Sequence, residues 1–192
     1  MSEETMMTGA SVRSPLASAA RLAALLAGGS LVMVISAKIT VPFWPVPMTM
    51  QVYGAFLLAA LAGGRLAAAM ILVYLAEGAL GLPVFASTAG GGAGLAALFG
   101  PTGGYLAGFV IAALIAGEWM PRSGRRSGGA ALPPMLFGLG VIYLCGGLWL
   151  APFVGWSKVM AVGVMPFFVG DLCKVLLAAV TAAILLRWKE RA

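Results

Sequence analysis

The chain has 192 residues, of which 61% are hydrophobic and only 9% are charged, and it carries a net charge of +6. Soluble domains contain roughly a quarter charged residues, so this composition excludes an ordinary soluble domain and indicates an integral membrane protein. The basic residues lie at the ends of apolar segments, as membrane topology requires, and therefore do not indicate binding to nucleic acid. The chain has no His, and Cys145 and Cys173 lie in separate apolar segments, so we expect neither a metal site nor a disulfide scaffold.

The first apolar segment follows a polar tail, residues 1–15, which we predict to be cytoplasmic. It runs from residue 16 to 37 and has the length of about 20 residues that a transmembrane helix needs. Ala19, Ala23 and Ala27 recur every four residues beside a second ridge of small residues. Such a face lets another helix approach closely. We interpret it either as internal packing or as a docking surface for a separate subunit.

A proline-rich segment, residues 38–51, follows this helix. Pro42, Pro45 and Pro47 cannot continue a helix and impose an extended path. The segment is nevertheless apolar and aromatic, which predicts that it folds over a cavity or lies in the membrane interface. Trp44 is interpreted either as an interfacial anchor or as a ligand contact.

Five more helices are predicted from the apolar pattern, and the segments between the third and fourth are unusual. Residues 81–94 are rich in glycine, which lets the backbone approach another group closely. The apolar residues 95–99 after it indicate a re-entrant or packed loop. The remaining long connections are a basic loop at 121–130 and a loop at 151–163. The five helices are expected at about 47–63, 65–80, 105–120, 132–150 and 166–186.

The distribution of basic residues predicts the orientation. With a cytoplasmic N-terminus, eight basic residues lie on the inner side and two on the outer side. The apolar segments predict an all-α fold in which residues 16–187 form a membrane domain of six transmembrane helices. The charge bias predicts that both termini, including the tail at 188–192, are cytoplasmic. The inner residues are Arg13, Arg65, Arg122, Arg125, Arg126, Arg187, Lys189 and Arg191, and the outer ones are Lys38 and Lys158.

Asp171 and Lys174 lie within the last apolar segment, and Asp171 is about 8 Å below its outer end at Pro166. An ionisable residue inside a membrane is costly by about 2.5 kcal/mol or more, and by default it indicates function. Their spacing of three residues places both on one helix face, which also carries Phe167. We expect this face to turn inward, together with Ala178 and Thr181.

Three unusual external loops above this pair predict a ligand pocket open to the outside. The alternatives are a structural ion pair, an intramembrane enzyme that uses Asp171, or a purely structural membrane protein. An enzyme is disfavoured because the chain has no His and no second carboxylate on the same face. Glu77, near the outer end of the third helix, is expected either to reach water or to line the site.

Four pieces of sequence spread over the chain resemble the BioY family, the biotin-binding S components of energy-coupling-factor (ECF) transporters. They are VPMTMQ at 46–51, GLPVFA at 81–86, FGPTGGY at 99–105 and PFFVGDLCK at 166–174. The resemblance implies the S-component fold and capture of biotin as a transported ligand, without a cofactor and without enzymatic activity. It implies a multi-pass protein of the bacterial inner membrane. The alternatives are an S component for another vitamin and a biotin transporter that acts without partners.

The same resemblance implies the site residues and the partners. Asp171 and Lys174 are expected to bind biotin, and which of them meets the ureido group and which the valerate stays open. Thr49, Gln51, Gly91 and Tyr105 are further expected contacts, with Trp44, Phe85 and Tyr105 covering the ring. The ridge of Ala19, Ala23 and Ala27 is expected to dock on a transmembrane coupling subunit. Separate ATPase subunits supply energy, because the chain has no phosphate-binding Gly-x-x-x-x-Gly-Lys-[Ser/Thr] loop.

Overall fold

The computed structural model describes residues 15–42, 44–86, 94–120 and 128–191. Helices dominate them, and two-residue strands form one short antiparallel pair. The elements in chain order are α1 (Pro15–Lys38), β1 (Thr40–Val41), β2 (Met48–Thr49), α2 (Gln51–Ala62), α3 (Gly64–Ala79), α4 (Leu95–Phe99), α5 (Gly103–Trp119), α6 (Gly128–Val154), α7 (Trp156–Val159), the π-helical turn η1 (Met160–Val164) and α8 (Met165–Arg191).

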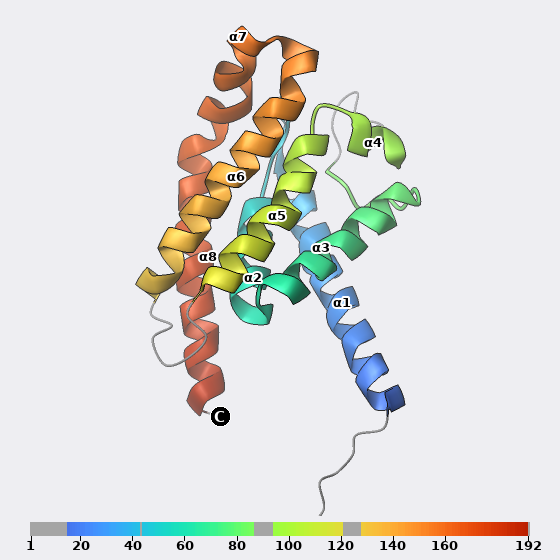
Figure 1. Ribbon diagram of the computed structural model, residues 1–192, viewed down its shortest axis with the longest axis vertical. Helices are drawn as coiled ribbons and strands as arrows, with labels where there is room; N and C mark the ends of the chain where they lie inside the picture. Colours follow the sequence, from blue (N-terminus) through green and yellow to red (C-terminus); the bar gives the residue numbers. More distant parts are fainter. Residues whose placement is uncertain (1–14, 43, 87–93, 121–127, 192) are drawn as a thin grey trace, which may run out of the picture.

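The helices pack into one bundle in which sequence neighbours are not always spatial neighbours. Helix α5 packs against α3 and α6, α2 packs against α5 and α8, and α1 packs mainly on α3. The start of α1 and the end of α8 lie at one end of the molecule, whereas α4 and α7 lie at the opposite end (Figure 1). Both long terminal helices therefore begin or end on the same side.

Glycine allows the closest of these helix contacts. A Cβ on Gly117 of α5 would lie 2.4 Å from the backbone nitrogen of Gly64 at the start of α3. A Cβ on Gly108 of α5 would lie 3.0 Å from the Cα of Ile142 on α6. The helix backbones themselves are thus in contact, as expected where helices associate through small residues.

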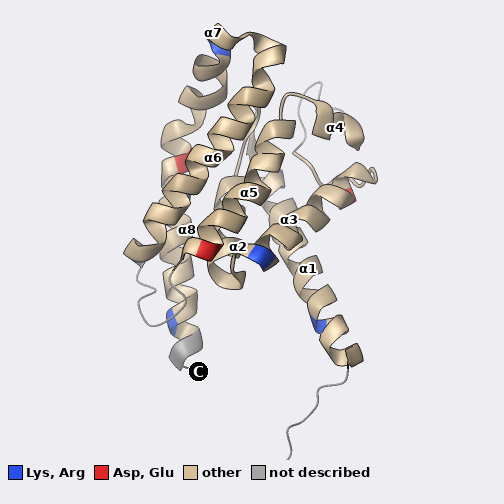
Figure 2. Cartoon of the chain, viewed as in Figure 1, with Lys and Arg blue, Asp and Glu red and all other residues tan. Residues whose placement is uncertain are grey.

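The structure confirms an apolar helical protein of the membrane class. Among the described residues, three helical stretches are long and apolar enough to cross a membrane: Pro15–Lys38, Gly129–Val154 and Trp156–Trp188. Figure 2 shows how sparse charged residues are along the helices. Each of the six predicted helices has a counterpart in α1, α2, α3, α5, α6 and α8. Helix α2, with 12 residues, is about 18 Å long, which is shorter than a hydrocarbon core of about 30 Å, so a crossing at this point also needs the residues next to α2.

The predicted start of the second helix near Pro47 was wrong. Thr40 pairs with Thr49, and Val41 pairs with Met48, so the chain is extended up to Thr49 and α2 begins at Gln51. The backbone N–H and C=O groups of Met48 and Thr49 are used in the strand pairing and are therefore not available for hydrogen bonds within a helix. A proline at the first helical position is a sound rule, but here the pairing of the two strands overrides it.

The predicted loop at 151–163 was also wrong in part, because it contains helix. Helix α6 continues through Pro152 and ends before Gly155, whose positive φ of 84° stops it. The chain turns helical again at once in α7 and η1. Residues 95–99 form the short helix α4. The last helix continues to Arg191, five residues past its predicted end.

The inward face predicted for the last helix is confirmed. Phe167, Asp171, Lys174 and Ala178 are buried on α8, and Thr181 is half-buried. Helix α8 therefore presents Asp171 and Lys174 to the interior of the protein and not to lipid.

Candidate ligand-binding site

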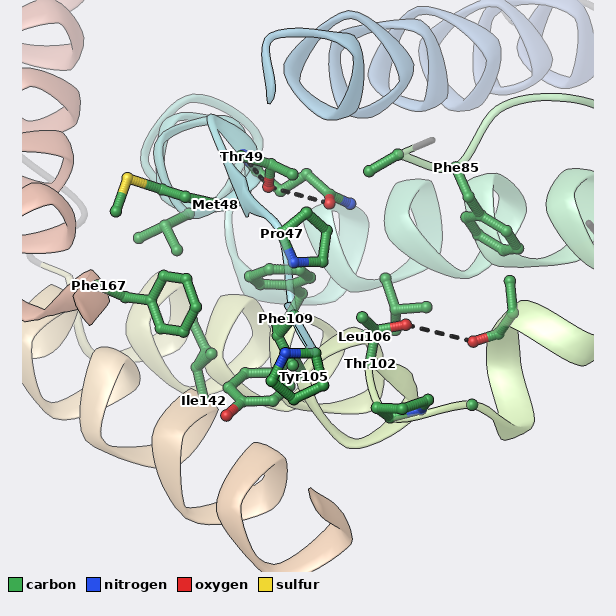
Figure 3. A pocket seen from close by; sticks show the side chains of 18 of the residues that line it. Pro47, Met48, Thr49, Phe85, Thr102, Tyr105, Leu106, Phe109, Ile142 and Phe167 are labelled. Carbon is green, nitrogen blue, oxygen red and sulfur yellow. Dashed lines mark hydrogen bonds between the residues drawn. The ribbon is translucent and has the colours of Figure 1, made fainter. Parts of the chain in front are cut away.

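A cavity of about 370 Å³ lies among the proline-rich segment, α4 and residues of α2, α3, α5, α6 and α8. Its volume falls in the range of about 300–1,000 Å³ that is typical of small-molecule sites. The close-up in Figure 3 shows aromatic and aliphatic side chains on several sides of it. The polar or charged side chains in its lining are Thr49, Gln51, Tyr74, Thr102, Tyr105, Tyr143 and Asp171.

Among the described residues, Asp171 is the charged one in the lining of this cavity. It is only 5% exposed, and both of its carboxylate oxygens accept hydrogen bonds. Lys174 Nζ lies 2.8 Å from Oδ1, and the Tyr143 hydroxyl donates to Oδ2 at 2.8 Å. Asp171 and Tyr143 line the cavity, whereas Lys174 does not belong to its lining. Lys174 therefore neutralises Asp171 from outside the cavity, and each carboxylate oxygen keeps a lone pair for a further donor.

A second polar group comes from β2, the start of α2 and α3. The Thr49 hydroxyl donates to Gln51 Oε1 at 3.1 Å, and it accepts from the Gln51 backbone N–H at 3.2 Å. Gln51 Nε2 donates to the Tyr74 hydroxyl at 3.0 Å. The Thr49–Gln51 bond is drawn in Figure 3. These contacts fix the orientation of the Gln51 amide, whose second N–H is left available to a ligand.

Aromatic rings form much of the apolar wall. Tyr105 lines the cavity, and its hydroxyl donates to the Gly163 carbonyl of η1 at 2.8 Å. Phe85 stands edge-on to Tyr74, with ring centroids 5.4 Å apart. Trp44 also lines the cavity but is 80% exposed, so it lies at the mouth. The three aromatic residues expected to cover a ligand thus all reach the same cavity.

The segments around Phe85 and at 97–100 form what we call the outer cover of the cavity. Hydrogen bonds to their main-chain oxygens attach this cover to the bundle. Lys38 Nζ, at the end of α1, donates to the Phe85 carbonyl at 2.9 Å. Trp149 Nε1 of α6 donates to the Gly100 carbonyl at 2.9 Å. The Thr102 hydroxyl donates to the Ala97 carbonyl at 3.3 Å (Figure 3). The three bonds hold segments from different parts of the chain over one space.

Of the remaining predicted residues, those that the structure describes lie elsewhere. Gly91 falls outside the described residues. Glu77 accepts a hydrogen bond from the Ser30 hydroxyl and is not part of the cavity lining. Ala19, Ala23 and Ala27 are exposed on α1, so their ridge does not pack within the described bundle.

Sequence reasoning missed two site residues, Tyr143 and Tyr74. The available signal was a phenol within an apolar helix, because a buried Tyr hydroxyl usually finds a hydrogen-bond partner. The sequence does not say which partner that is. Tyr143 bonds to Asp171 across 28 residues, and Tyr74 bonds to Gln51 across 23.

Comparisons with known proteins agree with this architecture. The model of the BioY family matches residues 6–191. A probable biotin transporter BioY of Pyrococcus horikoshii is 44% identical over 148 residues, which is 77% of this chain and 85% of the relative. The biotin transporter BioY of Thermotoga maritima is 38% identical over 151 residues, which is 78% of this chain and 86% of the relative.

A solved structure shares the fold. The crystal structure of the S-component for biotin from an ECF-type ABC transporter superposes with a TM-score of 0.74 and 23% identity. The match covers 88% of this chain and 93% of that one. Because the family model matches nearly the whole length and the relatives are well above 30% identical, the chain belongs to the BioY family.

Proposed function

We propose that this chain is the biotin-capture subunit of a vitamin uptake transporter. The observation that carries the proposal is the buried carboxylate of Asp171, which faces a cavity of ligand size in a member of the BioY family. The relatives of P. horikoshii and T. maritima are named as biotin transporters, which supports the same ligand.

The polar groups of the cavity suit the ureido group and the carboxylate of biotin. Asp171 offers acceptor oxygens, which suit the ureido N–H groups, and Tyr143 holds that carboxylate in place. Gln51 offers a donor to the ureido or carboxylate oxygen. The apolar thioether ring packs against the aromatic wall formed by Tyr105 and its neighbours. In this arrangement Asp171 contacts the ligand, whereas Lys174 supports Asp171.

The wider assembly is part of the proposal. The chain crosses the bacterial inner membrane six times with both termini in the cytoplasm, so that the cavity opens to the outside. The exposed ridge of Ala19, Ala23 and Ala27 docks on the transmembrane coupling subunit of an ECF transporter. Separate ATPase subunits then supply the energy for release of biotin to the inside.

The deciding experiment is a biotin titration of the purified protein and of Asp171→Asn. Hydrogen bonds to charged groups contribute about 1.5–3 kcal/mol, so we expect the variant to bind biotin at least tenfold more weakly. Glu118→Gln is the matched control, because it neutralises a carboxylate that faces Arg65 at the far end of α5 and does not line the cavity. Unchanged affinity in Asp171→Asn removes this residue from the site. Tight binding of another vitamin in place of biotin refutes the proposed ligand.

A further inference from the structure

The proposed ligand carries a negative charge that the interior of the cavity does not balance. Biotin has an ionised valerate at the end of a flexible chain. Asp171 and Lys174 neutralise each other at 2.8 Å, and Lys174 lies outside the lining. An isolated carboxylate is costly to remove from water without a partner. A cation at another part of the cavity would therefore contribute to binding.

Lys38 is placed to be that cation. It ends α1 on the outer side of the proposed topology, and its ammonium group lies 2.9 Å from the carbonyl oxygen of Phe85, a residue of the cavity lining. That bond uses one of its three N–H donors and leaves two. This bond ties the Lys38 ammonium group directly to a residue of the lining.

Other parts of the chain do not supply an alternative cation for the carboxylate of the ligand. Segment 87–93, which follows Phe85 and lies outside the described residues, contains no Lys or Arg. Lys158, the other outer basic residue, belongs to α7 and does not line the cavity. Arg65 faces Glu118 at 3.8 Å.

Building on the proposed function, we propose that Lys38 binds the carboxylate of the ligand at the mouth of the cavity and so determines specificity for the acid form. The acceptor oxygens of Asp171 favour the same orientation, because they can bind the ureido N–H groups and offer no donor to the valerate. The ligand thus lies with its bicyclic ring toward α8 and its tail toward the end of α1. Lys38 is exposed, so the ion pair forms without burial of the ammonium group.

The test compares two ligands, biotin and its neutral alcohol analogue biotinol, on the full-length purified protein. Exposed ion pairs contribute up to about 1 kcal/mol, so we expect Lys38→Gln to bind biotin about fivefold more weakly. Its affinity for biotinol should stay unchanged, because a neutral side chain at this position can still donate to the Phe85 carbonyl. Lys38→Arg should retain the affinity for biotin. The difference between the ligands should shrink at high salt, as for any exposed pair.

Lys158→Gln is the matched control, since it removes the other outer basic residue and the same net charge; both affinities should stay at the wild-type values. Equal losses of biotin and biotinol in Lys38→Gln would overturn the inference, because they would mean that Lys38 only holds the Phe85 backbone. Equal affinity of the wild type for both ligands would also overturn it while leaving the proposed function intact. If the wild type bound neither ligand, the proposed function would fail first.

Discussion

Gly146 of α6 offers a direct test of how helix packing shapes the cavity. A Cβ at this position would lie 2.3 Å from Cδ1 and Cε1 of Tyr105, whose ring lines the site. Ordinary contacts begin near 3.4 Å, so in Gly146→Ala the buried ring must move by about 1 Å. A movement of this size away from α6 stretches the 2.8 Å hydrogen bond from the Tyr105 hydroxyl to Gly163 beyond hydrogen-bonding distance.

The expected cost follows from these two effects. Overpacking a well-packed core costs about 1–3 kcal/mol, and the lost hydrogen bond adds about 1 kcal/mol. We therefore expect Gly146→Ala to lower the free energy of unfolding by about 2–4 kcal/mol. The biotin affinity should fall about tenfold, which corresponds to a displaced wall of the cavity.

Gly140 on the same helix is the matched control. A Cβ there meets no atom within 4 Å, so Gly140→Ala should be neutral or should stabilise the protein by up to about 1 kcal/mol through helix propensity. Thermal unfolding in detergent and biotin titration of both variants measure the two effects. The reasoning is refuted if Gly146→Ala unfolds and binds like Gly140→Ala.

Two further predictions concern Asp171 and the exposed face of α1. Tyr143→Phe removes the donor to Asp171 Oδ2, so we expect biotin to bind more weakly and the free energy of unfolding to fall by about 1.5–3 kcal/mol, whereas Tyr53→Phe, outside the cavity lining, should change neither. If Tyr143→Phe kept the wild-type values, the 2.8 Å hydrogen bond would contribute neither to the free energy of unfolding nor to biotin affinity. Ala23→Leu adds bulk to the exposed ridge, so the subunit should still bind biotin but should no longer co-purify with its coupling subunit; intact co-purification would place the docking surface elsewhere.

The sequence was sufficient where one local signal decides the structure. Asp171 in an apolar run predicted a polar group inside the protein, and the helical period placed it on the same face as Phe167; both residues are buried in the structure. The sequence did not predict that Lys174 lies outside the lining of the cavity. Residues three apart on an α-helix are offset by about 60° around its axis, so they share a face but do not point to the same spot.

Features that depend on contacts between distant segments could not be predicted. Nothing near Tyr143 identifies Asp171 as its partner, because the bond arises from the packing of α6 on α8. The extended path through Pro47 depends on pairing with Thr40 and Val41, which competes with the local preference for a helix start. Around Gly155 a loop was predicted where the chain is mostly helical. The stretch contains typical loop residues, but only this glycine interrupts the helix.

The attachment of the outer cover has a consequence for changing the ligand of this protein. Lys38, Trp149 and Thr102 all donate to backbone oxygens, those of Phe85, Gly100 and Ala97, and these three acceptors belong to residues that line the cavity. A backbone oxygen is present whatever the side chain. The side chains at 85 and 97 can therefore be exchanged to accommodate a different molecule without removing an acceptor that fastens the cover. The main chain thus holds the cover, and the side chains contact the ligand. Positions 85 and 97 are therefore the natural starting points for redesign of ligand preference.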